Sequence, residues 1–562
     1  MEQHASLLSS TQCGDMTVLY LLQESSGQVG LWLVPTALQN RVVSRRPALT
    51  EPEVRRLPWS APPAWAVDPL VPLRCVGDDP PAGFAQGRTM RSAPQEYQLR
   101  YRTQELARDA GETAIVTYLE RDDGLACEHR LIHRQDDAAL RVRVILRNTT
   151  PHPVTVAMLG SFALGGITPF ASAQVFAPTA AFNMGVAAFF TKWARDCDDA
   201  QQPDGELPDV VPARTTTDGG PGWSDARVLC PWAMYVAYGD IPLLRRHYAS
   251  MVRWLEWEAS TMRDGLRCDD GCGYFQGYSD WLALDSAWQS VWSATPRAFI
   301  GTAYVAHSAG VLADIAALLG HEDDAARFQR IRATAVGGFN REFVAPSGRL
   351  GVQTQTAHLM ALAWDLLPEE ARPAAFDRLL ALLEERAWHL STGFLGTPLL
   401  CPVLTRFGRV DLAYKVFLQQ DYPGWLFPVR NGATTMWERW NSWTPDRGFG
   451  DASMNSFNHY AYGAIGRWMY DTIAGLAPDP RRPGYKHATI VPRPGGGITH
   501  ACASLASLHG RIETSWRIEE DRFLLDVLLP SNTTATASLP DGTTHELRAG
   551  RHSLACTWMR NE

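Results

Sequence analysis

The pattern of apolar and polar residues changes twice along the 562-residue chain. In the first third, short runs alternate apolar or β-branched residues with polar ones, at residues 17–23, 29–34, 113–120 and 140–148. A period of two is typical of half-buried strands. Turn-rich stretches such as 77–87 separate the runs. The pattern therefore predicts an N-terminal antiparallel β-sandwich over residues 1–172.

Near residue 180 the period lengthens to that of an amphipathic helix. Short loops rich in Gly, Pro and Asp join roughly ten such segments, at 180–200, 225–240, 241–260, 301–320, 323–340, 354–367, 372–388, 397–408, 409–421 and 456–476. Short loops make successive helices antiparallel neighbours, so residues 173–477 are predicted to form a domain of helical hairpins. Strand patterns return at 511–520, 522–530 and 534–540, which predict a small C-terminal β-sandwich over 478–562.

Residues 148–191 contain no Asp, Glu, Lys or Arg. Membrane-spanning segments share this property. Here, however, glycines and prolines interrupt the stretch at positions 160, 165, 166, 169 and 178. A buried strand followed by a buried helix accounts for the pattern better, and no membrane partner is expected.

Charge and cysteine content exclude further classes of function. The formal net charge is −8 and no Lys- or Arg-rich block occurs, which argues against a nucleic-acid partner. Cys268 and Cys272 form the one close cysteine pair, without a second pair or a histidine run, so neither a metal nor another cofactor is expected. The N-terminal run lacks a signal-peptide pattern, which predicts reduced thiols and a cytoplasmic protein. The sequence leaves open whether the chain forms a homo-oligomer.

Tryptophan is the compositional outlier, with 20 residues. Indole rings fill cores, and they also form flat platforms for the apolar faces of sugar rings. Four stretches combine aromatic residues with an acid or a histidine, at 221–226, 277–285, 434–443 and 456–463. Loops at one end of a ring of helical hairpins converge, and aromatic walls with a few acids describe a carbohydrate cleft.

Eight stretches resemble, in the same order, the bacterial α-L-rhamnosidases of glycoside hydrolase family 78. They are QVFAPTAAFNM, FFTKWARD, DAQQPDGELPDVVP, GGPGWSDARVLCPW, HLSTGFLGTP, QQDYPGWLFPV, GATTMWERWNSW and SFNHYAYGAIGRWMY, within about 390 residues from 173 to 562. The resemblance implies a central (α/α)6 six-hairpin barrel and an inverting hydrolysis of rhamnosides. In such a reaction one carboxylate activates water and an acid protonates the leaving oxygen.

The resemblance also implies roles for individual residues. Glu438 matches the general base that acts in the removal of a terminal α-L-rhamnose. Trp223, Trp281 and His459 match residues that wall the sugar subsite. Further candidates for substrate binding, or for support of that wall, are Trp440, Asp225 and Asp280.

Plainer roles stay open for the same residues. Glu438 could form a surface ion pair with Arg439, and His459 could be a core histidine. Ordinary core packing could account for Trp223 and Trp281.

The stretch before residue 174 departs from the family pattern. The resemblance places the general acid there, in a motif of Asp, Arg and Glu residues. Residues 158–178 nevertheless contain no Asp, Glu or Arg, and Ser172 stands where the last Asp of the motif belongs. The barrel is therefore expected to be incomplete at its start. The carboxyl groups nearest to this gap are those of Asp225, Asp218 and Glu206.

The first third has a resemblance of its own. Residues 70–93, 124–137 and 158–170 resemble the N-terminal β-sandwich of family 36 α-galactosidase-type glycosidases, whose catalytic barrel does not follow here. Three hypotheses result: an active α-L-rhamnosidase, a rhamnose-binding pseudoenzyme that has lost its general acid, and a non-functional fusion. Hydrolysis, or rhamnose binding without hydrolysis, distinguishes the first two.

Overall fold

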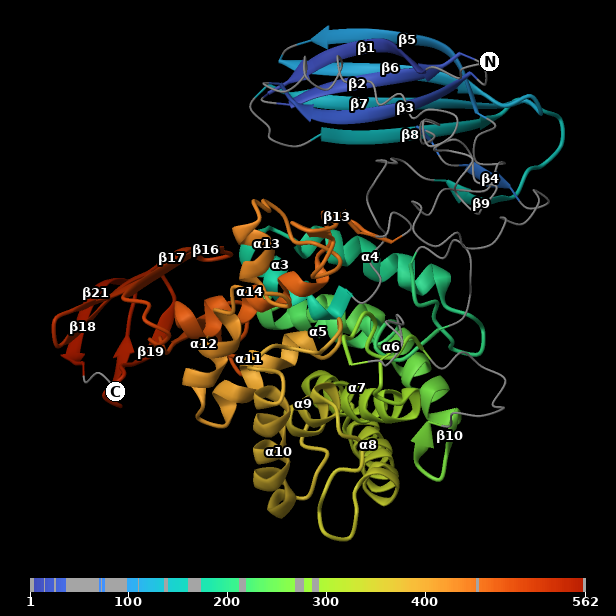
Figure 1. Cartoon of the computed structure of the whole chain (residues 1–562). Helices are drawn as coiled ribbons and strands as arrows, with labels where there is room; N and C mark the ends of the chain where they lie inside the picture. The colour runs from blue at the N-terminus through green and yellow to red at the C-terminus, as the bar shows by residue number, and fades with distance from the viewer. Residues whose placement is uncertain are drawn as a thin grey trace. The chain divides into compact units, whose positions relative to one another are not determined.

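The computed structural model describes residues 5–14, 16–24, 27–36, 70–71, 73–75, 99–109, 111–135, 140–159, 173–211, 219–267, 277–285, 293–450 and 454–558. Two compact units make up the chain, the first formed by Met1–Pro169 with Arg214–Thr216 and the second by Phe170–Ala213 with Thr217–Glu562. Figure 1 shows strands, then helices, then strands along the chain. This predicted order is confirmed.

In the first unit two antiparallel sheets share one core. One sheet consists of β1 (Ala5–Cys13), β2 (Met16–Gln23) and β3 (Gln28–Pro35). The other consists of β5 (Arg100–Asp109), β6 (Glu112–Glu120), β7 (Leu125–Arg134) and β8 (Leu140–Asn148), and β4 (Leu73–Cys75) pairs with β9 (Val156–Leu159). Tyr20 and Leu31 of the first sheet pack in the same buried cluster as Leu119 and Leu131 of the second.

The second unit begins with the helices. They are α3 (Ala177–Asn183), α4 (Ala187–Ala200), α5 (Ala226–Tyr238), α6 (Ile241–Ser260), α7 (Arg297–Leu319), α8 (Glu322–Phe343), α9 (Gln355–Ala363), α10 (Arg372–Glu384), α11 (Thr397–Arg406), α12 (Val410–Phe417), α13 (Leu426–Arg430) and α14 (Ile465–Trp468). The described residues thus hold twelve α-helices, against the roughly ten predicted. One addition is α13, which has only five residues.

The other addition arises because the predicted helix over 180–200 is broken. Met184 is extended, with φ −144° and ψ 154°. The Tyr238 hydroxyl lies at the break, where it accepts a hydrogen bond from the Val186 N–H (3.1 Å) and donates one to the Met184 carbonyl (3.3 Å). A residue of α5 therefore satisfies the backbone groups between α3 and α4.

Alternate helices contact one another in a circuit: α3 contacts α5, α5 contacts α7, α7 contacts α9, α9 contacts α11, α11 contacts α14, and α14 contacts α3. The helices α4, α6, α8, α10 and α12 pack against members of this circuit. Residues 160–172, which include Ser172, lie outside the described residues. The expectation that the barrel lacks its start therefore stays a prediction.

Among the described helices, α7 is the one long and apolar enough to cross a membrane by length and composition. Its Ile300, Ala306 and Ile315 are nevertheless buried, and it contacts α5, α8 and α9. A core helix of a soluble fold has these properties. In the uncharged stretch 148–191, β9 and α3 are described, whereas residues 160–172 between them are not.

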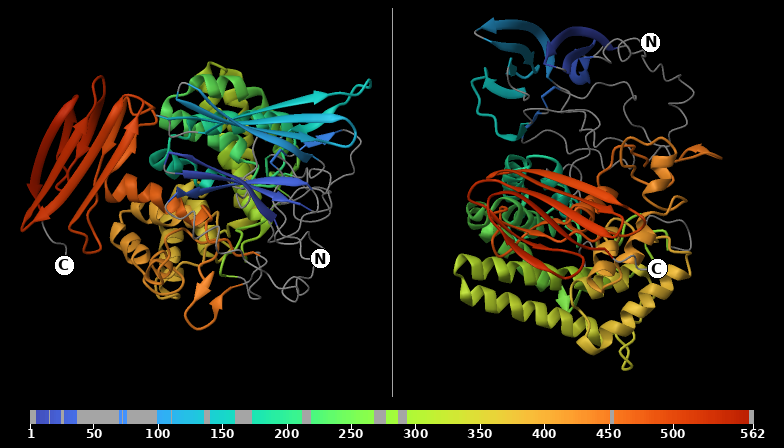
Figure 2. Two further views of the ribbon diagram at one scale, coloured as in Figure 1. Left: turned by 90° about the horizontal axis from the view of Figure 1, so that it is seen from above. Right: turned by 90° about the vertical axis from the view of Figure 1, so that its left-hand side faces the viewer.

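The C-terminal strands form two sheets within the second unit. One contains β14 (Leu476–Pro478), β15 (His487–Ile490), β19 (Thr534–Ser538) and β20 (Thr544–Leu547), and the other contains β16 (His500–Ser507), β17 (Gly510–Glu519), β18 (Arg522–Leu529) and β21 (Gly550–Thr557). Figure 2 shows these strands in red beside the helices. Trp516 and Phe523 share a core with Phe182 of α3, and the Trp516 Nε1–H donates to the Ile473 carbonyl (2.7 Å).

Candidate functional site

The four aromatic stretches lie mostly in loops that come before helices of the circuit, and 456–463 runs into the 3₁₀ helix Ala461–Ala464. Residues 219–225 precede α5, 277–285 lie before α7, and 434–443 and 454–464 precede α14. A fifth loop, 389–396, precedes α11. A helix begins with unpaired N–H groups and a partial positive charge. The loops therefore collect hydrogen-bond donors around their carboxylates.

Glu438 lies where residues 435–438 run beside residues 456–459. Its N–H donates to the Ser456 carbonyl (2.9 Å), and the Ser456 N–H donates to Glu438 Oε2 (2.7 Å). The His459 N–H donates to the Met436 carbonyl (2.8 Å), which continues the pairing. These bonds fix one carboxylate oxygen and leave Oε1 without a donor among the described residues.

The surroundings of Glu438 differ from those of a surface ion pair. The side chain is half-buried, and no ion pair with Arg439 occurs in the described structure. Arg439 instead donates from Nε to the Met454 carbonyl (3.0 Å). Burial raises the pKa of Glu438 above its ordinary value, opposed by the Ser456 N–H and by the Arg439 charge. The carboxyl is thus held at a defined place and kept more basic than an exposed glutamate.

His459 lies between two rings. Its imidazole stacks on Phe394 at 4.9 Å and on Tyr460 at 5.0 Å between ring centroids. The Ala461 N–H donates to Nδ1 (3.3 Å), so the proton of the neutral ring is on Nε2. Burial lowers the pKa of His459 to about 4. At neutral pH the residue therefore offers a single N–H donor, from Nε2.

Trp223 and Trp281 are joined by a residue that the sequence patterns did not single out. The Tyr278 ring lies 4.9 Å from the Trp223 ring and 5.5 Å from the Trp281 ring, measured between centroids. Trp223 is 6 % exposed and Trp281 is half-buried. Tyr278 lies within the stretch GYSDWLALD, where an aromatic residue beside the predicted tryptophan was the available signal.

Asp280 is fully buried and accepts four hydrogen bonds. Its donors are the N–H groups of Gly393 (2.8 Å), Leu395 (2.7 Å) and Gly396 (3.1 Å), and the Thr356 hydroxyl. Burial raises the pKa of Asp280 to about 6, and these donors oppose the rise. The structure therefore places Asp280 between loops instead of in contact with solvent.

Asp225 is also fully buried, at the start of α5. One oxygen accepts from the Gly222 N–H (2.7 Å) and the other from the Ser308 hydroxyl. Burial raises its pKa, and burial followed by the Asp225 charge raises the pKa of Glu258. Arg267 donates to Glu258 (3.1 Å), and its charge also opposes the rise in the pKa of Asp225, so one cation acts on both carboxyl groups.

Trp440 packs inside the helical core. It is 2 % exposed, stacks on Tyr462 at 4.0 Å and meets Trp425 edge-on at 5.6 Å between centroids. Its Nε1 has no hydrogen-bond acceptor among the described residues. This position supports the loop around Glu438 and leaves little of the indole for a ligand.

The carboxyl groups near the sequence gap are only partly described. Asp218 lies outside the described residues, as do Cys268 and Cys272. Glu206 is half-buried and accepts from the Gly219 N–H (2.9 Å). Because both oxygens of Asp225 are engaged below the surface, Asp225 is poorly placed to protonate a leaving group.

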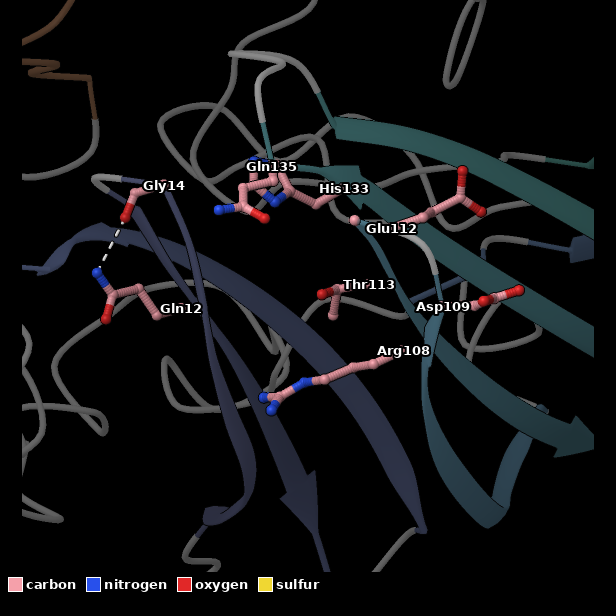
Figure 3. A pocket seen from close by; sticks show the side chains of 9 residues that line it. Gln12, Gly14, Arg108, Asp109, Glu112, Thr113, His133 and Gln135 are labelled. Carbon is pink, nitrogen blue, oxygen red and sulfur yellow. Dashed lines mark hydrogen bonds between the residues drawn. The ribbon is translucent and has the colours of Figure 1, made fainter.

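Among the described residues, one pocket lies in the first unit and another lies beside the loops around Asp280. The larger, about 530 Å³, lies in the first unit and is lined by polar residues that include Gln12, Arg108, Glu112, Thr113, His133 and Gln135, as Figure 3 shows. The predicted site residues all belong to the other unit. A smaller pocket of about 190 Å³ is bordered by Asp285, Thr354 and Ser391, next to the loops around Asp280.

Comparison with known families accounts for most of the second unit. Residues 170–473 match the bacterial α-L-rhamnosidase six-hairpin glycosidase domain. Residues 475–553 match the bacterial α-L-rhamnosidase C-terminal domain. The helical circuit and the C-terminal sheets are thus the parts that these two families share with the chain.

Individual proteins give the same result. An α-L-rhamnosidase of Streptomyces avermitilis is 46% identical over 368 residues, which are 65% of this chain and 34% of that protein. An α-L-rhamnosidase of Formosa agariphila is 38% identical over 385 residues, which are 68% of this chain and 41% of that protein. The crystal structure of the Streptomyces avermitilis α-L-rhamnosidase complexed with L-rhamnose superposes with a TM-score of 0.64 at 33% identity, covering 82% of this chain and 54% of that one. The chain spans between 34% and 41% of the length of these two curated relatives.

Proposed function

The chain belongs to the bacterial α-L-rhamnosidases of glycoside hydrolase family 78, and from this premise we propose that it hydrolyses terminal α-L-rhamnosides with inversion at the anomeric carbon. Glu438 is the general base, and the reaction uses no cofactor. The observation that carries the proposal is the fixed, half-buried Glu438 carboxylate, whose Oε2 is held by Ser456 while Oε1 is left for a water.

In the proposed reaction, Glu438 accepts a proton from a water molecule while the water oxygen bonds to the anomeric carbon. The bond from that carbon to the aglycone oxygen breaks on the opposite face of the sugar. The Nε2–H of His459 suits a sugar hydroxyl or the attacking water, because the neutral ring is a donor at that atom only. The row of Trp223, Tyr278 and Trp281 provides apolar surface for the sugar ring.

Replacing Glu438 by Gln tests the base. The amide keeps the shape but accepts no proton, so hydrolysis of p-nitrophenyl α-L-rhamnoside should fall by about 10²–10⁴-fold. Glu384→Gln, at an exposed position of α10, serves as the matched control and should retain activity. Undiminished turnover by Glu438→Gln would remove Glu438 from the mechanism.

A second proposal concerns the leaving group. Residues 158–178 contain no Asp, Glu or Arg, and both Asp225 oxygens are engaged in buried hydrogen bonds. Without an acid, the aglycone leaves as an anion. A phenolate, whose acid has a pKa of about 10, leaves more easily than an alkoxide, whose acid resembles water with a pKa of about 15.7.

We therefore expect fast hydrolysis of p-nitrophenyl α-L-rhamnoside and slow hydrolysis of a rhamnoside with a sugar as aglycone. Comparison of kcat/KM for the two substrates measures the difference. Equal and fast turnover of both would show that an acid is present.

The alternative function is rhamnose binding without hydrolysis. The absence of acidic residues from 158–178 favours it, since the aromatic row and His459 would need no general acid to bind a sugar. Under this alternative L-rhamnose raises the melting temperature while no aryl rhamnoside is cleaved. Detectable cleavage that is lost in Glu438→Gln excludes it.

A cytoplasmic location completes the proposal. The eight described cysteines are free thiols, of which six are buried. Reducing compartments maintain such thiols. Fractionation of the producing cells, with the protein detected by antibody, tests the location, and recovery outside the cytoplasm would contradict it.

A further inference from the structure

We propose that Asp280 is a positioning residue of the sugar subsite, which fixes the loop 391–396 and, through Phe394, the imidazole of His459. This inference rests on the proposed function, because it assigns His459 to a bound rhamnoside. It assigns Asp280 no contact with substrate.

The first step is the attachment of the loop. Asp280 Oδ1 accepts from the N–H groups of Leu395 (2.7 Å) and Gly396 (3.1 Å), and Oδ2 accepts from that of Gly393 (2.8 Å). The neighbouring backbone adds two bonds, from the Phe394 N–H to the Trp281 carbonyl (3.0 Å) and from the Leu284 N–H to the Ser391 carbonyl (2.8 Å). Residues 280–284 and 391–396 are therefore held as one body.

The glycines of the loop make this approach feasible. A Cβ atom on Gly393 would lie 2.2 Å from the Trp281 carbonyl oxygen and 2.5 Å from that of Asp280. On Gly396 it would lie 2.6 Å from the Thr356 hydroxyl oxygen and 2.9 Å from Asp280 Oδ2. At Gly393 the backbone of the Asp280 loop leaves no room for a side chain, and at Gly396 the Thr356 hydroxyl and the Asp280 carboxylate take up that space.

The local backbone shows that the placement of Asp280 is enforced. Ser279 and Leu282, on either side of Asp280 and Trp281, have φ values of 61°. Left-handed φ in non-glycine residues costs of the order of 1 kcal/mol or more and persists where surrounding contacts dictate it. The four donors to Asp280 are such contacts. Gly396 is also the N-cap of α11, and Thr356 lies in the first turn of α9.

The second step leads from the loop to His459. The Phe394 side chain is 6 % exposed, stacks on the His459 imidazole at 4.9 Å with 27° between the planes, and meets Tyr462 edge-on at 5.2 Å. Phe394 has its backbone N–H bound to Trp281 and its neighbours bound to Asp280. A shift of the loop therefore moves the ring that orients the Nε2–H of His459.

The test compares Asp280→Asn with Phe394→Leu. The Asn amide presents an NH₂ group to backbone donors, so the loop must relax. Phe394→Leu removes the stacking but keeps the Asp280 bonds. Both variants should raise KM for p-nitrophenyl α-L-rhamnoside and Kd for L-rhamnose by about tenfold, a 1.4 kcal/mol effect, with a smaller change in kcat. Asp280 acts on His459 through Phe394, so the two substitutions disturb the same contact. The KM of the double variant should therefore be no higher than that of the more affected single variant.

A direct readout comes from the imidazole ¹H–¹⁵N resonances of His459, assigned with His459→Gln. They should shift in both variants. Ile512→Val, in the C-terminal core, is the control for lost stability alone and should leave KM and these resonances unchanged. Folded Asp280→Asn with wild-type KM and resonances would overturn the inference, as would an unaffected Phe394→Leu.

Other outcomes are also decisive. If Asp280→Asn does not fold, Phe394→Leu decides alone, through KM and Kd. If the wild type neither hydrolyses rhamnosides nor binds L-rhamnose, the proposed function fails. In that case the His459 resonances of Asp280→Asn decide the positioning role separately: unchanged resonances refute it, and shifted ones retain it.

Discussion

At the scale of single residues, Glu438 and His459 have pKa values shifted in opposite directions by one cause, burial. Burial disfavours charge, so it raises the pKa of a carboxyl and lowers that of an imidazole. Both residues are thereby driven towards their neutral forms. For Glu438, a general base, the neutral form is inactive, so activity is lost at acidic pH. For His459, a hydrogen-bond donor, the neutral form is the one required.

The pH dependence of hydrolysis follows from these directions. The active form of Glu438 is the carboxylate, so kcat/KM should rise with pH through an apparent pKa above the 4.5 of an ordinary glutamate. His459, with a pKa of about 4, is neutral through that rise and should add no limb near 6.5. A pH profile of kcat/KM for p-nitrophenyl α-L-rhamnoside measures this. A limb near the ordinary histidine value that persists in Asp280→Asn, which lacks the carboxyl with a pKa of about 6, would contradict it.

At this scale the sequence marked candidate residues where one stretch carries the whole pattern, and their roles stay predictions. TTMWERWNSW marked Glu438, and the structure holds that carboxylate between two loops. The surroundings of Asp280 were not predictable, because Gly393, which donates to it, lies 113 residues away in the sequence. Those of Trp440 were not predictable either, because its indole stacks on Tyr462 in a different stretch. Phe394 was missed although its stretch, HLSTGFLGTP, had been recognised.

At the scale of elements, Thr179 joins the first and last helices of the circuit. Its buried hydroxyl donates to the Ala464 carbonyl (3.1 Å) and accepts from the Arg467 N–H (3.0 Å). Gly466 allows this approach, since a Cβ there would lie 2.5 Å from the Thr179 methyl carbon. One side chain of α3 thus satisfies two backbone groups at the start of α14.

Thr179→Val should destabilise the second unit. Valine keeps the shape but loses both hydrogen bonds, so a buried donor and acceptor are left unsatisfied, at a cost of about 1–3 kcal/mol each. Urea-induced unfolding measures the loss. Thr334→Val, on the exposed side of α8, where the hydroxyl bonds only to its own helix, should change stability by less than about 0.5 kcal/mol. Equal effects of both variants would contradict a special role for Thr179.

Elements were predictable where apolar periodicity reflects burial. The strand pattern at 113–120 became β6, and the helix pattern at 301–320 became most of α7, which ends at Leu319. β5 was missed because it is an edge strand whose residues, RYRTQELARD, are mostly exposed and polar. Edge strands commonly carry charges that prevent pairing with other chains. The break between α3 and α4 depends on Tyr238, which lies 54 residues from Met184.

At the scale of the whole molecule, the two units have separate cores. Leu131 belongs to the core of the first unit, whereas the helical circuit and the C-terminal sheets have cores of their own. The predicted site residues all belong to the second unit. Ligand binding and first-unit stability should therefore be separable in one experiment.

Calorimetry should resolve two unfolding transitions. L-rhamnose at 100 times its Kd should stabilise the second unit by about 2.7 kcal/mol and raise only that transition. Leu131→Ala, which removes a fully buried side chain from the first unit, should lower only the other transition, by about 2–5 kcal/mol. A single transition that responds to both changes would show that the units unfold together.

The bond between Thr179 and Ala464 also constrains how the protein is made. These residues are 285 positions apart. Ribosomes add about 5–20 residues per second, so α3 emerges roughly 15–60 s before its partner α14 exists. During that interval Ala180 and Phe182 of α3, which are buried in the finished fold, lack α14 and the C-terminal core that cover them. The apolar residues of α3 therefore stay uncovered on the nascent chain until α14 and the C-terminal strands have been synthesised.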